Sequence, residues 1–138
     1  MKTLKFNQFV NEGAIADNAY GQFFAGMLAI RAQAHLFHWQ TSSYSKHVAF
    51  GGFYDAYILL VDKLAEALMS KQERPTVGKA TIEIVDHSDE AINLFLNEAY
   101  ALFQGPGAEI CGQDSELKNI LDEIVAEINK LKYLLTLS

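Results

Sequence analysis

Residues 74–87, RPTVGKATIEIVDH, form a break between two long helical patterns and continue neither of them. Pro75 disfavours helix at its own position and at the residue before it, because its ring removes an amide hydrogen and crowds the preceding backbone. The apolar side chains of Ile82, Ile84 and Val85 fit either a short helix or an extended segment that covers the core, and both interpretations stay open. At about 3.3 Å per residue, the roughly sixteen residues between the two helices are enough to traverse a helical domain from end to end.

Two amphipathic patterns precede this break. From about residue 17 to residue 39, apolar residues recur three or four positions apart, which predicts one face of a long helix. A second helix is expected from about residue 45 to residue 71, with Ser45 as its N-cap and with Gly51 and Gly52 weakening its first turns. The expected buried faces are Tyr20, Phe23, Met27, Ile30, Ala34 and Phe37 in the first helix, and Phe50, Tyr54, Tyr57, Val61, Leu64 and Leu68 in the second.

Two further helical patterns follow the break. Ser88 stands before two acidic residues, which predicts an N-cap with an acidic first turn and a helix that stops at Gly105-Pro106-Gly107. Asp114 is the expected N-cap of a last helix that runs almost to the C-terminus. Four amphipathic helices with one long connection predict an all-α fold, a ferritin-like four-helix bundle over residues 14–138 that follows a flexible tail of residues 1–13.

Composition and charge exclude several classes of function. The 138 residues, half of them hydrophobic, are enough for one buried core. The net charge of −6 and the absence of a basic cluster argue against nucleic acid or an anionic membrane as a partner. No apolar run is long enough for a membrane span and no secretory signal is visible, which predicts a soluble cytoplasmic protein. Cys111, the single cysteine, is expected to be a packed or loop residue in a reducing compartment.

Side chains of the metal-binding type recur at helical spacing at four positions, His38, His47, Asp62 and Glu66. Asp62 and Glu66 lie four residues apart, so one helix face can direct both carboxylates to one metal, and with imidazole nearby such ligands suit iron, manganese or zinc. His47 precedes Asp62 by fifteen residues, which is about 22 Å on a straight helix. One metal therefore cannot reach both residues within one copy of the helix.

An antiparallel two-fold dimer along this helix would bring the two groups together. His47 of one copy would then lie near Asp62 and Glu66 of the other, and His38, just across the turn, would add a second imidazole. The pattern thus predicts two half-sites, one of two histidines and one of two carboxylates, which only a second copy can join. The alternative is that each residue acts alone, as a solvated acid or as a histidine that caps or packs.

Other residues near these positions have simpler interpretations. His35 is expected to point outward, His87 to be a surface or capping residue, and Trp39 to pack beside the site. No Glu-x-x-His pair occurs in the sequence, so the di-iron site that a single ferritin-like bundle builds from two such motifs is not possible here.

Residues 23–75 resemble the Dps-type mini-ferritins, in which one helix ends in His-Trp and the next carries a His followed by an Asp and a Glu four apart. The matching residues are His38-Trp39, His47, and Asp62 with Glu66. The resemblance implies that His38, His47, Asp62 and Glu66 are the metal ligands and catalytic residues of an intersubunit ferroxidase centre. It also implies that iron(II) is oxidised by peroxide or oxygen and stored in a hollow dodecamer.

This chain departs from the family pattern at several points. Gly51 stands where the family often has an additional acid, Ala67 replaces a common Arg, and the Lys-rich tail through which some members bind DNA is absent. Asp114, Glu116 and Asp122 are candidates for a three-fold iron pore. Two alternatives to a ferroxidase stay open: a catalytically inactive structural or packaged protein, for example of a phage head, and a protein that holds zinc or manganese structurally.

The first thirteen residues, from Met1-Lys2-Thr3 to Glu12-Gly13, are similar to the short head-targeting leaders of T-even-like phage internal proteins, which are cut after a Glu. An ordinary flexible tail is the preferred interpretation. A phage-encoded member of the family would lie in the host cytoplasm or in the virion.

Overall fold

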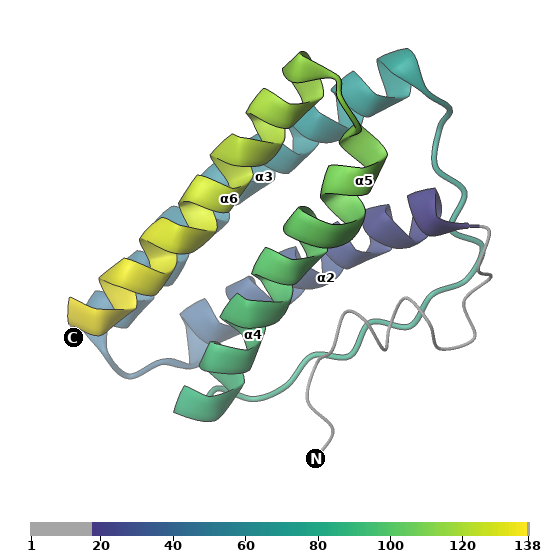
Figure 1. The fold of residues 1–138 in the computed structure, drawn as a ribbon. Helices are drawn as coiled ribbons and strands as arrows, with labels where there is room; N and C mark the ends of the chain where they lie inside the picture. The colour runs from purple at the N-terminus through teal and green to yellow at the C-terminus, as the bar shows by residue number, and fades with distance from the viewer. Residues whose placement is uncertain (1–17, 138) are drawn as a thin grey trace.

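The computed structural model describes residues 18–137, and within that range the chain is helical with no strand. Its four long helices are α2 (Ala19–Gln40), α3 (Tyr44–Lys71), α4 (Asp89–Leu102) and α6 (Ser115–Leu134) (Figure 1). Three short elements complete the chain, namely the π-helical η1 (Phe103–Gly107), α5 (Ala108–Cys111) and the 3-10 helix η2 (Leu135–Leu137). This confirms the expected all-α class. The predicted tail of residues 1–13 lies outside the described residues.

One apolar core lies between the four long helices. Its largest fully buried side chains are aromatic and come from three helices and from η1, namely Phe23, Phe37, Phe50, Tyr57, Phe95 and Phe103. The predicted faces are confirmed in their main part, although Tyr20, Tyr54 and Val61 are only half-buried and Phe53, which was not predicted, is buried. No helix in the described range is long and apolar enough to cross a membrane.

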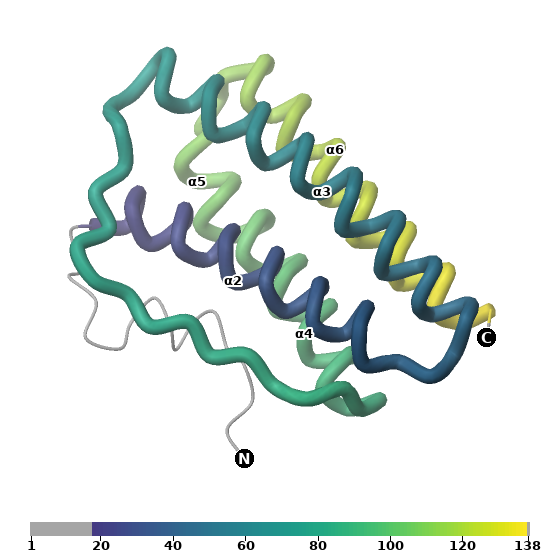
Figure 2. Tube along the Cα trace, turned by 180° about the vertical axis from the view of Figure 1, so that it is seen from behind, coloured from purple at the N-terminus to yellow at the C-terminus, as the bar shows by residue number. Residues whose placement is uncertain are grey.

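The directions of the helices follow from contacts at their ends. Lys71, at the end of α3, pairs with Asp114 at the start of α6, so these two helices are antiparallel. Lys46, in the first turn of α3, pairs with Asp89, the first residue of α4, at 3.5 Å, so α3 and α4 start at the same end and run parallel. Figures 1 and 2 show that residues 72–88 return the chain along α2 to make this possible.

The connector, residues 72–88, is extended and not helical. Asn18, before α2, donates a hydrogen bond to the Thr76 carbonyl at 2.7 Å, and Gln40, at the end of α2, donates to the Asp86 carboxylate at 2.9 Å. The ten residue-to-residue steps from Thr76 to Asp86 therefore follow a 22-residue helix of about 33 Å, at about 3.3 Å per step, whereas ten steps in a helix would cover only about 15 Å. The contacts thus decide between the two interpretations that the sequence left open.

Gln33 holds the connector against α2 through a contact that sequence reasoning missed. Its buried side-chain amide donates to the Val85 carbonyl at 2.9 Å and accepts from the Val85 amide at 2.8 Å. Both backbone groups of Val85 are thereby satisfied, as they would be by a neighbouring strand. A buried glutamine in an apolar helix face was the available signal, because burying an amide requires partners for it.

The predicted N-caps are partly correct. Ser88 accepts from the Ala91 amide at 3.0 Å and Asp114 from the Leu117 amide at 3.1 Å, as expected. The prediction of Ser45 was wrong, because α3 begins at Tyr44 and Ser43 is its N-cap, with its hydroxyl accepting from the Lys46 amide. The turn between α2 and α3 is therefore only residues 41–43.

The predicted helix stop at Gly105-Pro106-Gly107 was also wrong. The chain passes through these residues as the π-helical η1 and continues into α5, and it leaves helical geometry only at Gly112, where φ is +58°. A π-helical turn is wider than an α-helical one and shifts the hydrogen-bond register, which leaves room for the Pro106 ring and removes the need for its amide hydrogen. Gly107 also packs closely on the core, since a Cβ there would lie 3.1 Å from the Phe23 and Leu121 side chains.

Candidate functional site

His38 and His47 form a reciprocal pair at the turn between α2 and α3, here called the histidine clamp. The Nδ1 of His38 lies 2.8 Å from the His47 carbonyl oxygen, and the Nδ1 of His47 lies 2.9 Å from the His38 carbonyl oxygen. The two rings stack with their centroids 3.9 Å apart and an interplanar angle of 16°. Because a carbonyl oxygen only accepts hydrogen bonds, each Nδ1 carries the hydrogen and donates it.

This arrangement leaves Nε2 of both rings available. A neutral imidazole protonated at Nδ1 has its lone pair on Nε2, and within residues 18–137 no hydrogen bond engages Nε2 of either histidine. A backbone carbonyl that holds one ring nitrogen while the other faces outward is the usual support of a metal-binding histidine. The histidine clamp therefore presents two oriented nitrogens that are candidate metal ligands.

Gly51 provides the space in which the His38 ring lies. A Cβ at position 51 would lie 3.0 Å from Cε1 and 3.3 Å from Nδ1 of His38, so any larger residue would push against the ring. At Gly52, by contrast, no atom lies within 4 Å of the position of a Cβ. The glycine at position 51 thus has a steric reason in this chain.

Asp62 and Glu66 lie further along α3, with both side chains exposed. Neither carboxylate takes part in a hydrogen bond or ion pair with another residue in the range 18–137. In that range no group of three or more His, Cys, Asp or Glu side chains could hold a metal ion. The structure therefore brings His38 and His47 together but does not bring the two carboxylates to them within one chain.

His35 was expected to point outward, but it does not point freely into solvent. Its ring lies between Trp39, with centroids 4.2 Å apart, and Tyr54, with centroids 4.0 Å apart, and is half-buried. The prediction was wrong because α3 supplies Tyr54 as a partner that the α2 pattern alone does not show. Trp39 packs on His35 beside the histidine clamp and is 67 % exposed.

His87 is not a free surface residue either. Its ring packs edge-on against Phe37, with centroids 6.2 Å apart, and its backbone amide donates to Gln40 at 2.7 Å. Its Nε2 is buried and has no hydrogen-bond partner among the described residues. The connector carries His87 onto the core, and that path depends on the contacts with α2.

Two of the three acids proposed for a pore are engaged within the chain. Lys71 binds the Asp114 carboxylate at 2.7 Å and the Glu116 carboxylate at 2.6 Å. The hydrogen bond from Lys71 lowers the pKa of Asp114, and the hydrogen bonds to Asp114 and Glu116 raise the pKa of Lys71. Of these three acids, the exposed Asp122 is the one without an ion pair in the described part of the chain.

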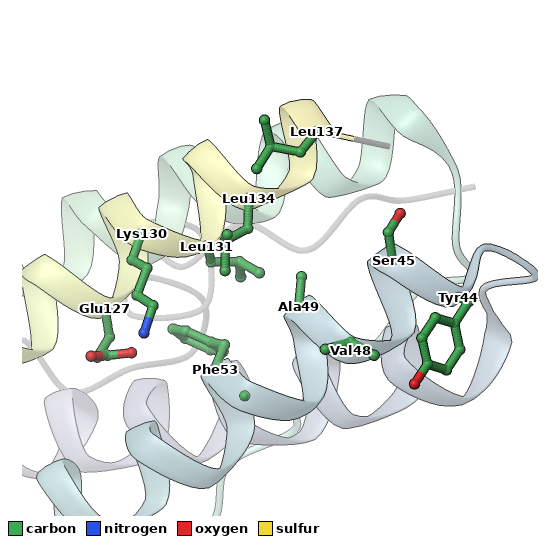
Figure 3. A pocket seen from close by; sticks show the side chains of 11 residues that line it. Tyr44, Ser45, Val48, Ala49, Phe53, Glu127, Lys130, Leu131, Leu134 and Leu137 are labelled. Carbon is green, nitrogen blue, oxygen red and sulfur yellow. The ribbon is translucent and has the colours of Figure 1, made fainter.

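An apolar groove of about 410 Å³ lies between the first turns of α3 and the end of α6 (Figure 3). Val48, Ala49 and Phe53 form one side, and Leu131 and Leu134 form the other. Glu127 and Lys130 are the charged residues in its lining, and none of the four candidate ligands contributes to it. The groove is therefore separate from the candidate metal site.

Four helices around one core, with two imidazoles oriented at a helix turn, define an all-α protein with a candidate half-site for a metal. More particularly, the chain belongs to DUF5856, a family of unknown function, which matches it over residues 38–135. The matched range contains all four candidate ligands. No curated protein and no solved structure matched the chain.

Proposed function

We propose that this protein is a ferritin-like, mini-ferritin-type protein that binds iron(II) at sites shared between two copies and oxidises it. The observation that carries the proposal is the histidine clamp, in which the His38 and His47 carbonyls fix both rings with Nε2 available. Such a pair would be the nitrogen half of each site. Asp62 and Glu66 of the partner subunit would be the oxygen half.

The order and direction of the helices support the ferritin-like assignment. Among four-helix bundles, those with a single long crossover connection include the ferritin-like folds. Here the connector returns the chain along α2, so that α3 and α4 run parallel while the other consecutive helices are antiparallel. This topology comes from contacts within the chain and is independent of the ligand pattern.

The exposed carboxylates support the shared site. Asp62 and Glu66 have no partners in the described range, and they lie one helical turn apart on α3. Within one chain, His47 and Asp62 are about 22 Å apart along α3. An antiparallel pairing of α3 with its copy would place His47 of one copy beside Asp62 of the other. Two carboxylates with two neutral imidazoles suit iron, and their negative charge favours the iron(III) product.

The redox step needs an oxidant, which we propose is peroxide or oxygen. Each iron(II) ion loses one electron, so two iron(II) ions and two protons reduce one hydrogen peroxide to two water molecules. The iron(III) formed would then be stored, and a closed dodecameric cage would provide the space. We place this activity in the cytoplasm, or in the virion if the protein is phage-encoded.

Iron oxidation followed by absorbance tests the proposal. The variant Asp62→Ala with Glu66→Ala is expected to lose the fast oxidation that the unmodified chain shows with peroxide or oxygen. Glu123→Ala with Glu127→Ala is the matched control, because it removes the same charge at the same spacing from α6. Equal rates in all three proteins would rule out the assignment of these carboxylates.

A second candidate is a ferritin-like protein without turnover, structural or packaged. The histidine clamp favours it to some extent, because the two hydrogen bonds already give His38 and His47 a role in joining α2 to α3. It predicts no iron oxidation and no bound metal. A structural zinc or manganese site at the same ligands would instead give bound metal without oxidation, so metal analysis and the oxidation assay together separate the three cases.

A further inference from the structure

We propose that residues 5–12 of a second copy bind as a short amphipathic helix in the apolar groove between α3 and α6. The occupant is therefore a named segment of this chain, supplied by another copy. The inference goes beyond the proposed function and uses none of the proposed iron ligands. Its basis is an open apolar groove and a matching apolar pattern in the segment that precedes the described residues.

The groove leaves large apolar side chains in contact with solvent. Val48 on α3 and Leu137 in η2 line it and are 51 % and 58 % exposed, and Tyr44, at the start of α3, is 81 % exposed. Figure 3 shows Val48 and Leu134 on facing helices. Gly52 keeps the groove open, because a Cβ at that position would meet no atom within 4 Å. Contiguous exposed apolar surface of this kind marks interaction sites, and a groove between two helices fits a third helix.

The segment before Asn18 carries an apolar pattern that fits such a groove. Phe6, Phe9 and Val10 follow the spacing i, i+3 and i+4, which places them on one face of a helix, with asparagine and glutamine side chains on the other. This spacing is the one by which amphipathic helices anchor in grooves. A helix of eight residues is not stable alone in water, so it would form on binding.

The charges of the segment match those of the groove. Glu127 and Lys130 line the groove, and neither has an ion pair in the range 18–137. Lys5 and Glu12 are seven residues apart, so two turns of helix place them on the same side. A segment that runs parallel to α6 brings Lys5 toward Glu127 and Glu12 toward Lys130. The reverse direction would place like charges together, which is unfavourable.

This direction excludes the segment of the same chain. Because α6 runs parallel to α2, Glu12 would point away from Asn18, where α2 begins. Gly52 lies about 12 Å into α3, so it is about 21 Å along the bundle from the start of α2, which is about 33 Å long. The groove is lined by α3, α6 and η2 and by no residue of α2, so the chain would also have to cross α3. Six steps from Glu12 to Asn18 cover only about 20 Å even when extended.

Disulfide cross-linking in a mixture of two full-length variants tests the contact. Both carry Cys111→Ala, which removes the buried native thiol, and one adds Val10→Cys while the other adds Gly52→Cys. The proteins are unfolded together, refolded and treated with oxidised glutathione, and mass spectrometry of a digest identifies the linked peptides. A link between the two positions is expected, because packed helices bring facing Cα atoms within the about 7 Å that a disulfide needs. Asn11→Cys in place of Val10→Cys is the matched control and is expected to link at least tenfold more slowly, because it lies on the polar face.

Changes to the segment test its anchor and its charge. Phe9→Ala in the Val10→Cys chain is expected to slow the cross-linking at least tenfold, because it removes a buried aromatic anchor. Glu12→Lys is expected to slow it about threefold, and Lys130→Glu in the Gly52→Cys chain is expected to restore the rate. Failure of this charge swap to restore the rate would overturn the direction of the segment.

Filling the groove gives a readout that needs no added cysteine. Gly52→Leu is expected to displace the segment, so that limited trypsin digestion cuts after Lys5 at least tenfold faster than in the unmodified chain. Gly105→Leu is the matched control, because it is an exposed glycine outside the groove whose Cβ would also meet no atom within 4 Å. Equal cleavage after Lys5 in the two variants would overturn the assignment of the groove.

The outcomes separate this inference from the proposed function. Asp62→Ala with Glu66→Ala, added to both chains, is expected to leave the cross-linking intact while iron oxidation is lost. A chain that carries both Val10→Cys and Gly52→Cys is expected to form the disulfide between copies, and a disulfide within one chain would overturn the assignment to a second copy. No link in either arrangement would overturn this inference and leave the iron assignment unaffected.

Discussion

His38 and His47 hold each other by two hydrogen bonds of 2.8 and 2.9 Å, each running from an imidazole Nδ1 to the carbonyl of the other residue. The same two bonds join the end of α2 to the start of α3 and fix which nitrogen of each ring is left available. The contact between the two helices and the orientation of the two candidate ligands are therefore one arrangement, and a change to either histidine will affect both.

Gly51→Ala is expected to weaken metal binding by the chain. Its Cβ would lie 3.0 Å from the His38 ring, which must then shift by a few tenths of an ångström and so strain its hydrogen bond to the His47 carbonyl. Isothermal titration with zinc(II) as the probe measures the effect, and Gly52→Ala is the matched control because its Cβ meets no atom within 4 Å. Gly52→Ala should raise the free energy of unfolding by about 0.5–1 kcal/mol, since alanine favours a helix over glycine. Equal metal binding in the two variants would contradict the steric role of Gly51.

Gln33→Leu is expected to lower the free energy of unfolding by about 2–4 kcal/mol. The apolar side chain leaves the buried amide and carbonyl of Val85 without partners. Urea denaturation followed by circular dichroism measures this loss, and Gln104→Leu, at an exposed position in η1, serves as the control. A loss no larger than that of the control would mean that Gln33 does not hold the connector.

A mixture of two inactive variants is expected to recover iron oxidation. His47→Ala removes one half-site, and Asp62→Ala with Glu66→Ala removes the other, so a mixed dimer keeps one complete site. The two proteins are unfolded together and refolded as an equal mixture, so that about half of the dimers are mixed. Each mixed dimer has one complete site out of two, so the expected rate is about a quarter of that of the unmodified protein. No recovery from a mixture that forms mixed dimers would show that the ligands do not come from two copies.

The contact between Lys71 and Asp114 predicts a pH dependence of stability. The pKa of Asp114 is lowered in the folded state by the hydrogen bond from Lys71, so the contact stabilises the fold above the unfolded-state pKa and this contribution is lost as the pH falls through the folded-state pKa. Lys71→Met is therefore expected to reduce stability at neutral pH and to reduce the further loss on acidification below about pH 4. Urea midpoints measured at several pH values test this, with Lys118→Met, an exposed lysine on α6, as the control.

The pattern of apolar residues was sufficient to predict the helices but not all of their ends. The spacing of Phe23, Met27 and Ile30, or of Ile120 and Ile124, reflects burial along one face, which a periodicity records directly. Gly105-Pro106-Gly107 was misjudged because local preference predicts a stop, whereas packing of Gly107 against the Phe23 and Leu121 side chains keeps the chain helical. Tertiary contacts outweigh local preference at such positions.

The candidate site, like the helices, could be predicted from the sequence only in part. His38, His47, Asp62 and Glu66 were recognisable from residue type and spacing, because ligand chemistry and helical rise are properties of the chain itself. The stacking of the two imidazoles and the roles of Gly51 and Gln33 were not, because each depends on how a second helix or the connector lies against the first. The sequence by itself determined the all-α class, the order of the helices and the four candidate ligands. Only the tertiary structure decided that the connector is extended and that each Nδ1 is held by a carbonyl, since a hydrogen bond between distant residues requires the fold that brings them together.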